Sequence, residues 1–341
     1  MTSYIPTNAA SSGIALDRKV LKSVAQRSDR PGLVYLGKWV VGLVITGFLI
    51  SITLGSAWEL VFMFLHGILL SVPAYAMSHE TAHGTAFRSR WINEWVLWVT
   101  SLIYMEEPLH RRYTHTNHHT FTWHVGKDSQ MPFDTPMALS GWLTEVSGFG
   151  LMRFHFLTLF QVAMGRPSAM LQTVTPPGEL PKLIRNAWLF IGFYLTLITL
   201  VVAGYHAILW YFVIPRLLGA PVMLLFTLTQ HVELQENCPS LLESTRSFRT
   251  TSLGRFLYLN MNHHIEHHLF PQVPFHGLPM LSQHLKDQLP VVDPGFFRFN
   301  WELLLVVIKR TLGRNTKGRG IRQAPHMVTD GTMTSIAKRS M

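Results

Sequence analysis

The sequence predicts an all-α integral membrane protein, with four transmembrane helices in two hairpins and a helical cap on the cytoplasmic side. The composition is the first reason: 48% of the 341 residues are hydrophobic, only 14% are charged, and the mean hydropathy is +0.20. Soluble proteins of this length are rarely so apolar. The second reason is a set of four apolar segments. Histidine clusters lie at the ends of those segments, a separate observation that bears on function.

The four apolar segments fall into two pairs. They occupy residues 33–54, 60–77, 187–204 and 208–229. Each is close to the roughly 20 residues that cross about 30 Å of hydrocarbon. Three residues, 55–57, separate the first pair, and three more, 205–207, separate the second pair. Such short connections predict that each pair forms a helical hairpin.

The distribution of basic residues predicts the orientation. Neither hairpin turn contains Lys or Arg, whereas the flanking segments hold Arg18, Lys19, Lys22, Arg27, Arg30, Arg88, Arg90, Arg111, Arg112 and Lys127. Basic flanks lie on the cytoplasmic side of a membrane by the positive-inside rule. We therefore expect a protein of the inner (cytoplasmic) membrane, with both termini and the histidine clusters on the cytoplasmic side.

The chain divides into three parts on this reading. Residues 1–32 are expected to form a cytoplasmic N-terminal segment, and residues 33–312 the membrane domain. Residues 313–341 are basic and aperiodic, a pattern typical of a flexible tail.

Three shorter apolar stretches complete the membrane domain. Residues 91–105 are too few to span the bilayer and predict a re-entrant or interfacial helix. Residues 149–164 mix basic and bulky apolar side chains, which favours a helix along the interface. Residues 301–312 predict another surface helix, or equally a helix packed against the cap.

The histidines form three clusters with helical spacing. They are HETAH at 79–83, HTNHH at 115–119 and HIEHH at 264–268. Because positions i, i+3 and i+4 lie on one helix face, we expect each HxxHH to present three imidazoles to a common point. Imidazole is a common ligand of transition metals, and these eight rings are too many for one ion. The spacing therefore predicts a binuclear metal site.

Composition also limits the other cofactors and partners. The single cysteine, Cys238, excludes an internal disulfide and a cysteine-ligated iron–sulfur centre within the chain. The formal net charge of +10 invites a nucleic-acid partner. However, the chain has no aromatic-rich basic motif, and positive-inside anchoring accounts for the charge. We expect no nucleic-acid partner.

The three clusters, in this order, resemble the histidine boxes of the membrane-bound fatty acid desaturase and hydroxylase superfamily. The resemblance covers Ser78 to Leu289 and includes the segment NMNHHIEHHLFPQVPFHGLP around the third box. It implies a non-haem di-iron centre held in the cap, with O2 as co-substrate. The implied iron ligands are His79, His83, His115, His118, His119, His231, His264, His267 and His268. His231 is included because the family takes a ninth ligand from the cytoplasmic end of the fourth helix.

Carboxylates near the boxes are candidates for holding the ligand rings in one tautomer, as carboxylate or carbonyl acceptors usually do. These candidates are Glu80, Asp128, Glu233 and Glu266. The alternative for each is a solvated carboxylate at a helix end. The family often has a fuller acidic motif after the second box than the Asp128 found here. His66 and His263 are expected not to be ligands.

Three residues before the second box are candidates for docking. His110, Arg111 and Arg112 are expected either to bind an anionic substrate head or to contact an electron donor. Ordinary positive-inside anchoring by the two arginines is the competing explanation.

The resemblance implies an O2-dependent oxidoreductase that introduces a double bond into a lipid acyl chain. Hydroxylation of a lipid or of a smaller polar molecule is the alternative, because hydroxylases and monooxygenases share the same boxes. No flavin or nicotinamide motif is present. Electrons are therefore expected from a ferredoxin or a small haem protein with its reductase, docked on the basic face.

Two other classes of protein fit the sequence less well. HETAH also matches H-E-x-x-H, the zinc metalloprotease motif, with Glu80 as general base, but this leaves both HxxHH boxes unexplained. A membrane metal transporter would need ionisable residues near the bilayer midplane, where the spans offer little beyond His66 and Arg216.

Overall fold

The computed structural model describes residues 3–4, 12–131, 135–290 and 295–313. This part of the chain is largely helical, which confirms the all-α prediction, and its one sheet is an antiparallel pair of two-residue strands. Apart from Gly313, the predicted tail lies outside the described residues.

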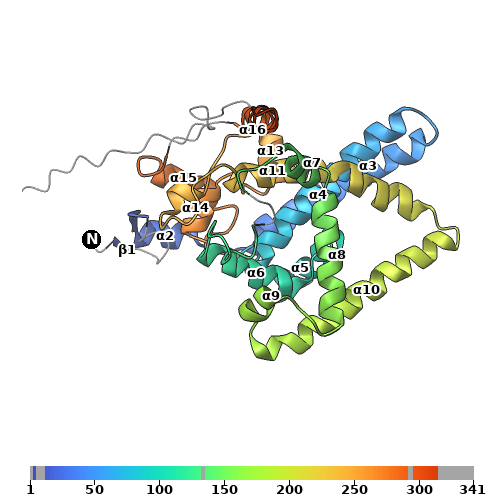
Figure 1. Cartoon of the computed structure of the whole chain (residues 1–341), viewed down its shortest axis with the longest axis horizontal. Coiled ribbons are helices and arrows are strands. Elements are labelled where there is room, and N and C mark those ends of the chain that lie inside the picture. Colours follow the sequence, from blue (N-terminus) through green and yellow to red (C-terminus); the bar gives the residue numbers. More distant parts are fainter. Residues whose placement is uncertain (1–2, 5–11, 132–134, 291–294, 314–341) are drawn as a thin grey trace, which may run out of the picture.

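The elements are shown in Figure 1. In chain order they are β1 (Ser3–Tyr4), β2 (Leu16–Asp17), α2 (Arg18–Val24), α3 (Asp29–Thr53), α4 (Trp58–Ala82), α5 (Arg90–Tyr104), α6 (Pro108–Thr120), α7 (Leu139–Val146), α8 (Phe149–Ala163), α9 (Ala169–Val174), η1 (Pro177–Glu179), α10 (Leu180–Val202), η2 (Leu209–Val213), α11 (Ile214–His231), α12 (Leu241–Ser244), α13 (Ser252–Leu257), α14 (His264–Leu269), α15 (Leu278–Leu285) and α16 (Phe296–Thr311).

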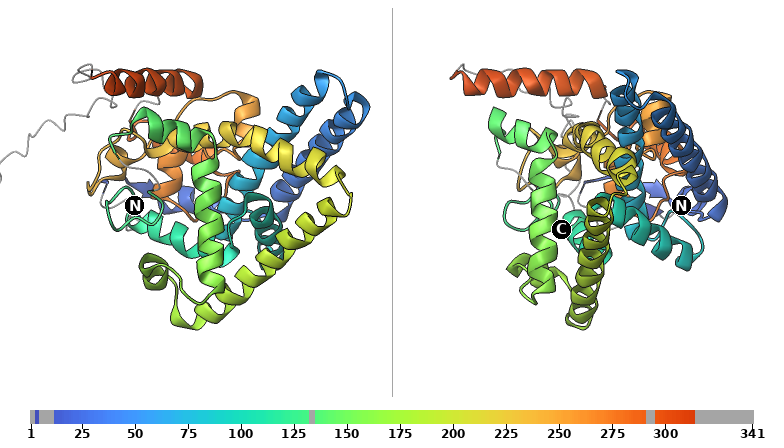
Figure 2. Two further views of the ribbon diagram at one scale, coloured as in Figure 1. Left: turned by 45° about the vertical axis from the view of Figure 1, so that its right-hand side comes forward. Right: turned by 90° about the vertical axis from the view of Figure 1, so that its right-hand side faces the viewer.

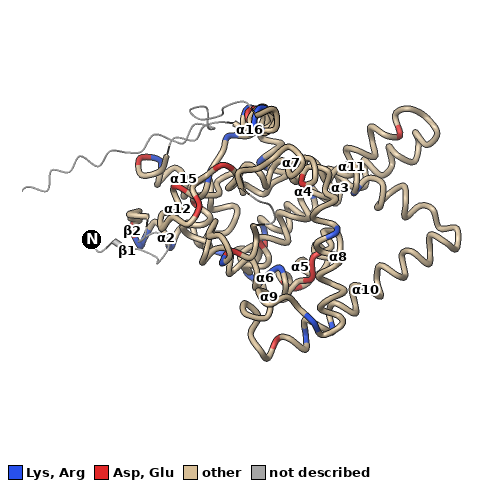
Figure 3. Tube along the Cα trace, in the orientation of Figure 1, with Lys and Arg blue, Asp and Glu red and all other residues tan. Residues whose placement is uncertain are grey.

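Four helical stretches are long and apolar enough to cross a membrane, as predicted. They are Arg18–Thr53, Trp58–Ala82, Pro177–Val202 and Leu209–His231. Charged residues concentrate at the cap and are sparse along the arms formed by these helices, as Figure 3 shows. Arms of this kind suit a hydrocarbon environment, because lipid cannot solvate charged groups.

The first pair of spans packs as a hairpin. Helix α3 is capped at its N-terminus by Ser28, whose hydroxyl accepts a hydrogen bond from the Arg30 amide. The Trp39 indole then donates to the Leu69 carbonyl of α4 at 2.8 Å. His66, which is not expected to be a metal ligand, is held between Thr46 and the Tyr211 carbonyl, at 2.7 and 3.1 Å.

Helices α4 and α11 touch backbone to backbone. A Cβ placed on Gly67 would lie 1.8 Å from the Pro215 carbonyl oxygen, and one on Gly219 would lie 1.9 Å from the Gly67 carbonyl carbon. Small residues permit such close crossings between membrane helices. From this crossing each helix runs 12 residues, about 18 Å at 1.5 Å per residue, to His79 in one case and His231 in the other. The crossing therefore fixes the spacing between the ends of α4 and α11 that carry His79 and His231.

The second pair of spans is open. Helices α10 and α11 diverge from their connection, so that α10 packs along α8 while α11 packs against α4 (Figures 1 and 2). The Tyr194 hydroxyl of α10 donates to the Leu102 carbonyl of α5 at 2.6 Å. The stretch at 91–105, predicted to be a short helix, is α5 and lies against α4.

The cap is built from the segments that follow the spans. Buried apolar residues of α2, α14 and α15 form one of its cores, which includes Leu21, Leu269 and Leu281. A second core joins α11 to α16 through Leu228 and Phe299. These cores position α14 and the end of α11, two of the four elements that carry the histidine clusters; α4 and α6 are the others.

Candidate metal centre

Nine histidines from four helices converge at the end of the bundle. Helix α4 supplies His79 and its C-cap His83, helix α11 supplies its last residue His231, and α6 and α14 each supply one HxxHH box. The rings form two groups, and within each group one nitrogen atom from every ring lies within 4.8 Å of the others. Site 1 comprises His79, His83, His115, His119 and His267, and site 2 comprises His118, His231, His264 and His268.

Each HxxHH box is divided between the two sites, so the prediction of one common point per box is wrong. The second box sends its first and last histidines to site 1 and its middle one to site 2, and the third box does the reverse. The reason is the helical turn of about 100° per residue. Position i+4 lies about 40° past position i, whereas i+3 lies about 60° short of it on the other side.

The distances between ring nitrogens fit coordination by shared ions. His119 Nε2 lies 3.0 Å from His115 Nε2 and 3.1 Å from His267 Nε2. His264 Nε2 lies at 3.0 and 3.1 Å from the same atoms of His231 and His268. Two nitrogens bound at right angles to one ion, with bonds of about 2.1 Å, are about 3.0 Å apart. A single ring nitrogen meeting two others at this distance is the arrangement expected around a metal.

Partners outside the clusters hold several rings in the tautomer that metal binding needs. The Nδ1–H of His118 donates to Asp128 at 2.8 Å, that of His115 to the Gln130 side-chain oxygen at 3.0 Å, and that of His231 to the Ser244 carbonyl at 2.8 Å. A neutral ring protonated at Nδ1 has its lone pair at Nε2. The Nε2 atoms of these three rings are therefore free to bind a metal from the inner side.

A hydroxyl serves the same purpose for His268. Thr122 donates its own proton to the His118 carbonyl at 2.7 Å, which leaves its oxygen to accept from His268 Nδ1 at 3.1 Å. In contrast, neither ring nitrogen of His79 has a hydrogen-bond partner among the described residues, although both are buried. Buried polar atoms without partners are uncommon in proteins, and a bound ion would satisfy one of them.

Asp128 connects the two sites. One of its carboxylate oxygens accepts from His118 and from the Trp123 amide, both at 2.8 Å, and the other accepts from the Gln130 amide at 2.8 Å. Gln130 in turn holds His115 of site 1. Burial raises the pKa of Asp128, but the interaction with the His118 ring and the hydrogen bonds from the Gln130 and Trp123 amides outweigh it and lower the pKa overall.

The other predicted carboxylate partners do not bind the rings. Glu80 accepts from the Thr85 hydroxyl at 2.6 Å and from the Phe275 amide at 3.0 Å, so it ties α4 to the segment after α14. Glu233 forms a two-pronged ion pair with Arg310 of α16 at 2.9 Å.

Glu266 is also turned away from the rings and accepts from Ser247. His263, excluded as a ligand, lies 3.5 Å from Glu266 instead. Of the four carboxylates predicted to hold ligand rings, Asp128 is the one that does so among the described residues.

Burial favours the neutral form of four of the clustered rings, His83, His115, His119 and His268. Desolvation lowers the pKa of His83 to about 3. Desolvation and the neighbouring rings lower the pKa of His115, His119 and His268 well below the usual range. Metals bind imidazole in its neutral form, so the protein holds these rings ready for coordination at neutral pH. An all-nitrogen donor set of this kind suits iron, zinc or copper.

Comparison with known families agrees with this geometry. The family described as fatty acid desaturase matches residues 56–300, which include all nine histidines. The chain belongs to the fatty acid desaturase family. A comparison with curated proteins found no match. Family membership supports an oxidoreductase that resides in a membrane and binds metal.

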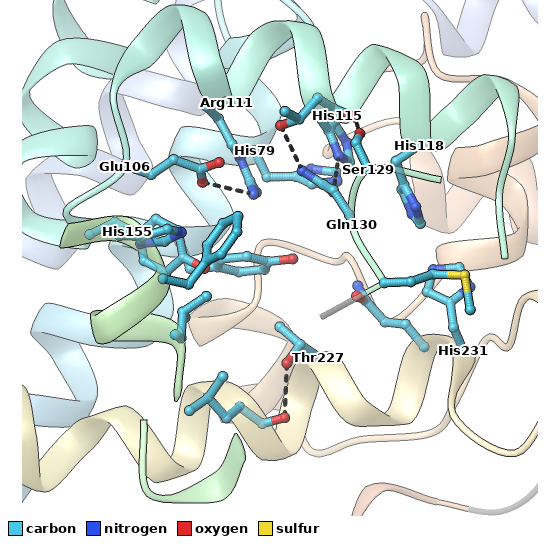
Figure 4. A pocket seen from close by; sticks show the side chains of 18 of the residues that line it. His79, Glu106, Arg111, His115, His118, Ser129, Gln130, His155, Thr227 and His231 are labelled. Atoms are coloured by element: carbon cyan, nitrogen blue, oxygen red, sulfur yellow. Dashed lines mark hydrogen bonds and ion pairs between the residues drawn. The ribbon is translucent and has the colours of Figure 1, made fainter. Parts of the chain in front are cut away.

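This member of the desaturase family has a cavity of about 190 Å³ beside both sites. Figure 4 shows His79, His115, His118 and His231 around it, together with Glu106, Arg111 and His155. The lining also includes Tyr75, Tyr104, His110, Thr114, Trp123, Ser129, Gln130, Met131, Glu145, Leu151, Phe154, Leu224, Thr227, Gln230, Val232 and His264. Histidines of both sites thus border one cavity.

The residues predicted to dock a substrate or donor divide between cavity and surface. His110 and Arg111 are buried cavity residues, bonded to Glu106 at 2.8 and 3.3 Å. Because Arg111 is 3% exposed, it is not available to a docked protein. Arg112 is partly exposed and pairs with Glu94 of α5 at 2.8 Å.

Sequence reasoning missed several residues of the site. Gln130 and Thr122 were not identified as ring partners, nor Glu106 and Glu145 as cavity residues. The start of α6 held one signal. Glu107 caps the helix by accepting from the His110 amide at 2.6 Å, and Pro108 follows at the first helical position. This capping pattern is recognisable in sequence. It predicts the start of α6 and so places Glu106, the residue before the cap, beside the helix that carries the second histidine box.

Proposed function

We propose that this desaturase-family protein is an O2-dependent di-iron oxidoreductase that oxidises a C–H bond of a molecule bound in the cavity. The observation that carries the proposal is the cavity itself, which is bordered by histidines of both sites. Site 1 and site 2 would each hold one iron through the nine rings. Bound there, two irons supply the redox chemistry with dioxygen that the amino acids lack.

The chain's own residues contribute positioning and exclusion of water. Asp128, Gln130, Thr122 and the Ser244 carbonyl fix the rings from outside. Aromatic side chains such as Trp123, which stacks on His231 with ring centroids 5.3 Å apart, shield the sites. Rings held in this way coordinate without rearranging, a condition for efficient catalysis by a preorganised site.

The cavity favours a smaller polar substrate over the lipid acyl chain expected from the family. Its volume of about 190 Å³ is below the roughly 300–1,000 Å³ of pockets for drug-sized ligands. Its lining includes Glu106, Arg111, Glu145 and Gln130, whereas an acyl chain would gain most from an apolar wall. A lipid acyl chain is the competing substrate in the test below.

Two further features of the proposal concern electrons and orientation. We expect a ferredoxin or small haem protein with its reductase as donor, docking on the basic face. We also expect the cap and both termini on the cytoplasmic side, in accordance with the basic flanks of the spans. Desaturation and hydroxylation remain the two alternative outcomes of C–H oxidation in this proposal.

The zinc protease alternative receives no support from the geometry. Its general base would be Glu80, yet that carboxylate is bonded to Thr85 and to the Phe275 amide. The two histidines of HETAH also share site 1 with three further rings, whereas a catalytic zinc keeps an open position for water.

The test compares cells that express the wild-type protein with cells that express His118→Ala or His267→Ala. Mass spectrometry of both lipid and aqueous extracts looks for a product lighter by two hydrogens or heavier by one oxygen. We expect such a product in the aqueous extract of the wild type alone. A change confined to the lipids would refute the small substrate. If either variant retained full activity, the assignment of the sites would be wrong.

A further inference from the structure

One wall of the cavity carries a carboxylate that the di-iron proposal does not use. Glu145 of α7 lines the cavity and is 7% exposed. Its side chain forms no hydrogen bond or ion pair within the part of the chain that the structure describes. Burial raises its pKa to about 7. A buried carboxylate without a partner is costly, so a ligand that neutralises it would be bound with a net gain.

The other charges that line the cavity are already balanced. Arg111 pairs with Glu106, and its guanidinium lies over the Tyr75 ring at 4.8 Å. Burial lowers the pKa of His155 to about 4, so this ring is neutral at pH 7. Among the described lining residues, Glu145 is therefore the acid whose charge no side chain offsets.

Arg111 nevertheless has hydrogen-bonding capacity left. Its Nε and Nη2 groups are buried and have no hydrogen-bond partner among the described residues. Arginine donates from five N–H groups and accepts nothing, so these two groups need oxygen atoms. Because Glu106 already balances the charge of Arg111, an oxygen without full charge is sufficient, as in a hydroxyl or an ether.

We propose that the cavity binds a small organic ammonium ion, with its cationic nitrogen at Glu145 and with hydroxyl or ether oxygens at Arg111. The inference rests on the proposed function, since it names the class of substrate for the same site. The aromatic lining, with Phe154, Tyr104 and Trp123, suits this ligand, because aromatic faces attract organic cations. A fatty acid offers the opposite charge pattern, with an anion at one end and no cation.

Direct binding to the purified protein tests the inference without requiring turnover. Isothermal titration calorimetry compares 5-amino-1-pentanol with pentylamine, 1-pentanol and pentanoate, which share a five-carbon chain. The titrations use the metal-free protein and are repeated with ferrous iron, because bound ions add positive charge to the same cavity. We expect 5-amino-1-pentanol to bind tightest, pentylamine about 10-fold more weakly, and the two probes without nitrogen more weakly still.

The Glu145→Gln variant removes the charge while preserving the size of the side chain. We expect it to weaken binding of both amines about 10- to 100-fold, as for a lost hydrogen bond to a charged group. The matched control is Glu302→Gln on α16, an acid that pairs with Arg298 at 2.8 Å outside the cavity lining. This control should bind all four probes like the wild type.

Two results would overturn the inference. One is tighter binding of pentanoate than of 5-amino-1-pentanol to the wild type, a comparison that needs no variant to fold. The other is an unchanged amine affinity in Glu145→Gln. Metal binding and C–H oxidation are measured separately, so a protein that oxidises a substrate but ignores amines would refute only the ammonium ligand. A protein that binds amines but neither holds iron nor reacts would refute only the proposed function.

Discussion

Replacing Asp128 by Asn should weaken metal binding at both sites. The carboxylate accepts three hydrogen bonds, from His118, the Trp123 amide and the Gln130 amide, each at 2.8 Å. An Asn side chain has one oxygen, so when that oxygen faces His118 its NH2 group faces the Gln130 amide, donor against donor. Gln130 would then shift, and with it the side-chain oxygen that holds His115 of site 1.

The magnitude follows from the hydrogen bonds that the substitution removes. An unsatisfied buried donor costs about 1–3 kcal/mol, and loss of an outer partner of a metal ligand lowers metal affinity about 10- to 100-fold. We expect a loss in that range at site 2, where His118 is affected directly, and a smaller loss at site 1. Gln130→Leu should weaken site 1 alone, because Gln130 holds a ring of that site.

The assay is chelator competition on the metal-loaded protein in detergent, with bound metal counted by mass spectrometry. Asp287→Asn provides the control, since Asp287 is exposed and lies outside the sites. Two metals held with wild-type affinity by Asp128→Asn would refute the role of Asp128. Weakening confined to one metal would refute the link from Asp128 through Gln130 to His115.

Three further predictions concern the helix crossing and pH. Gly219→Ala should destabilise the protein by about 1–3 kcal/mol and reduce its metal content, because the new Cβ would lie 1.9 Å from the Gly67 carbonyl carbon. Thermal unfolding tests this. The control Gly192→Ala, whose Cβ would meet nothing within 4 Å, should neither destabilise the protein nor reduce its metal content. Glu145→Gln should stabilise the protein at pH 8 by on the order of 3 kcal/mol but not at pH 4. The reason is that the pKa of Glu145 is about 7 in the folded protein, so the free-energy cost of ionising it there grows as the pH rises from about 4.5 to 7. The same stability difference between variant and wild type at both pH values would contradict the burial of this charge. Without its metals, the protein should lose stability steeply below about pH 6.5, by about 1.4 kcal/mol per ring per pH unit. The reason is that the unfolded chain takes up protons on rings such as His83, whereas in the folded protein desolvation lowers the pKa of His83 to about 3. Chemical denaturation of the metal-free protein between pH 5 and 7 tests this, and a stability that does not change with pH would contradict neutral buried rings.

Local sequence spacing was sufficient to find the histidines but not to distribute them. The i, i+3, i+4 pattern marks a helix face, yet the turn of about 100° between i+3 and i+4 decides which ion each ring reaches once two sites lie side by side. The division of the rings between the two sites depends on the positions of α4 and α11 relative to the two helices that carry the HxxHH boxes. His231 has no neighbour at ligand spacing, and its candidacy came from the family resemblance.

The outer partners depend on contacts that sequence does not reveal. Thr122 meets His268 across 146 residues, and Glu233 meets Arg310 across 77. A carboxylate beside a ligand in the chain, such as Glu233 near His231, can point to a distant cation instead. Asp128 was found because its partner His118 lies only 10 residues away, within the same local segment.

The divided boxes have a consequence for the order of biosynthesis. Site 1 includes His267 and site 2 includes His264 and His268, so neither donor set is complete until the last box has been translated and α14 has docked. A nascent chain that has already inserted all four spans still offers only part of each set of histidine ligands, so it binds any metal ion with lower affinity. We therefore expect full metal binding to come late in the maturation of this protein, after all four spans have been inserted.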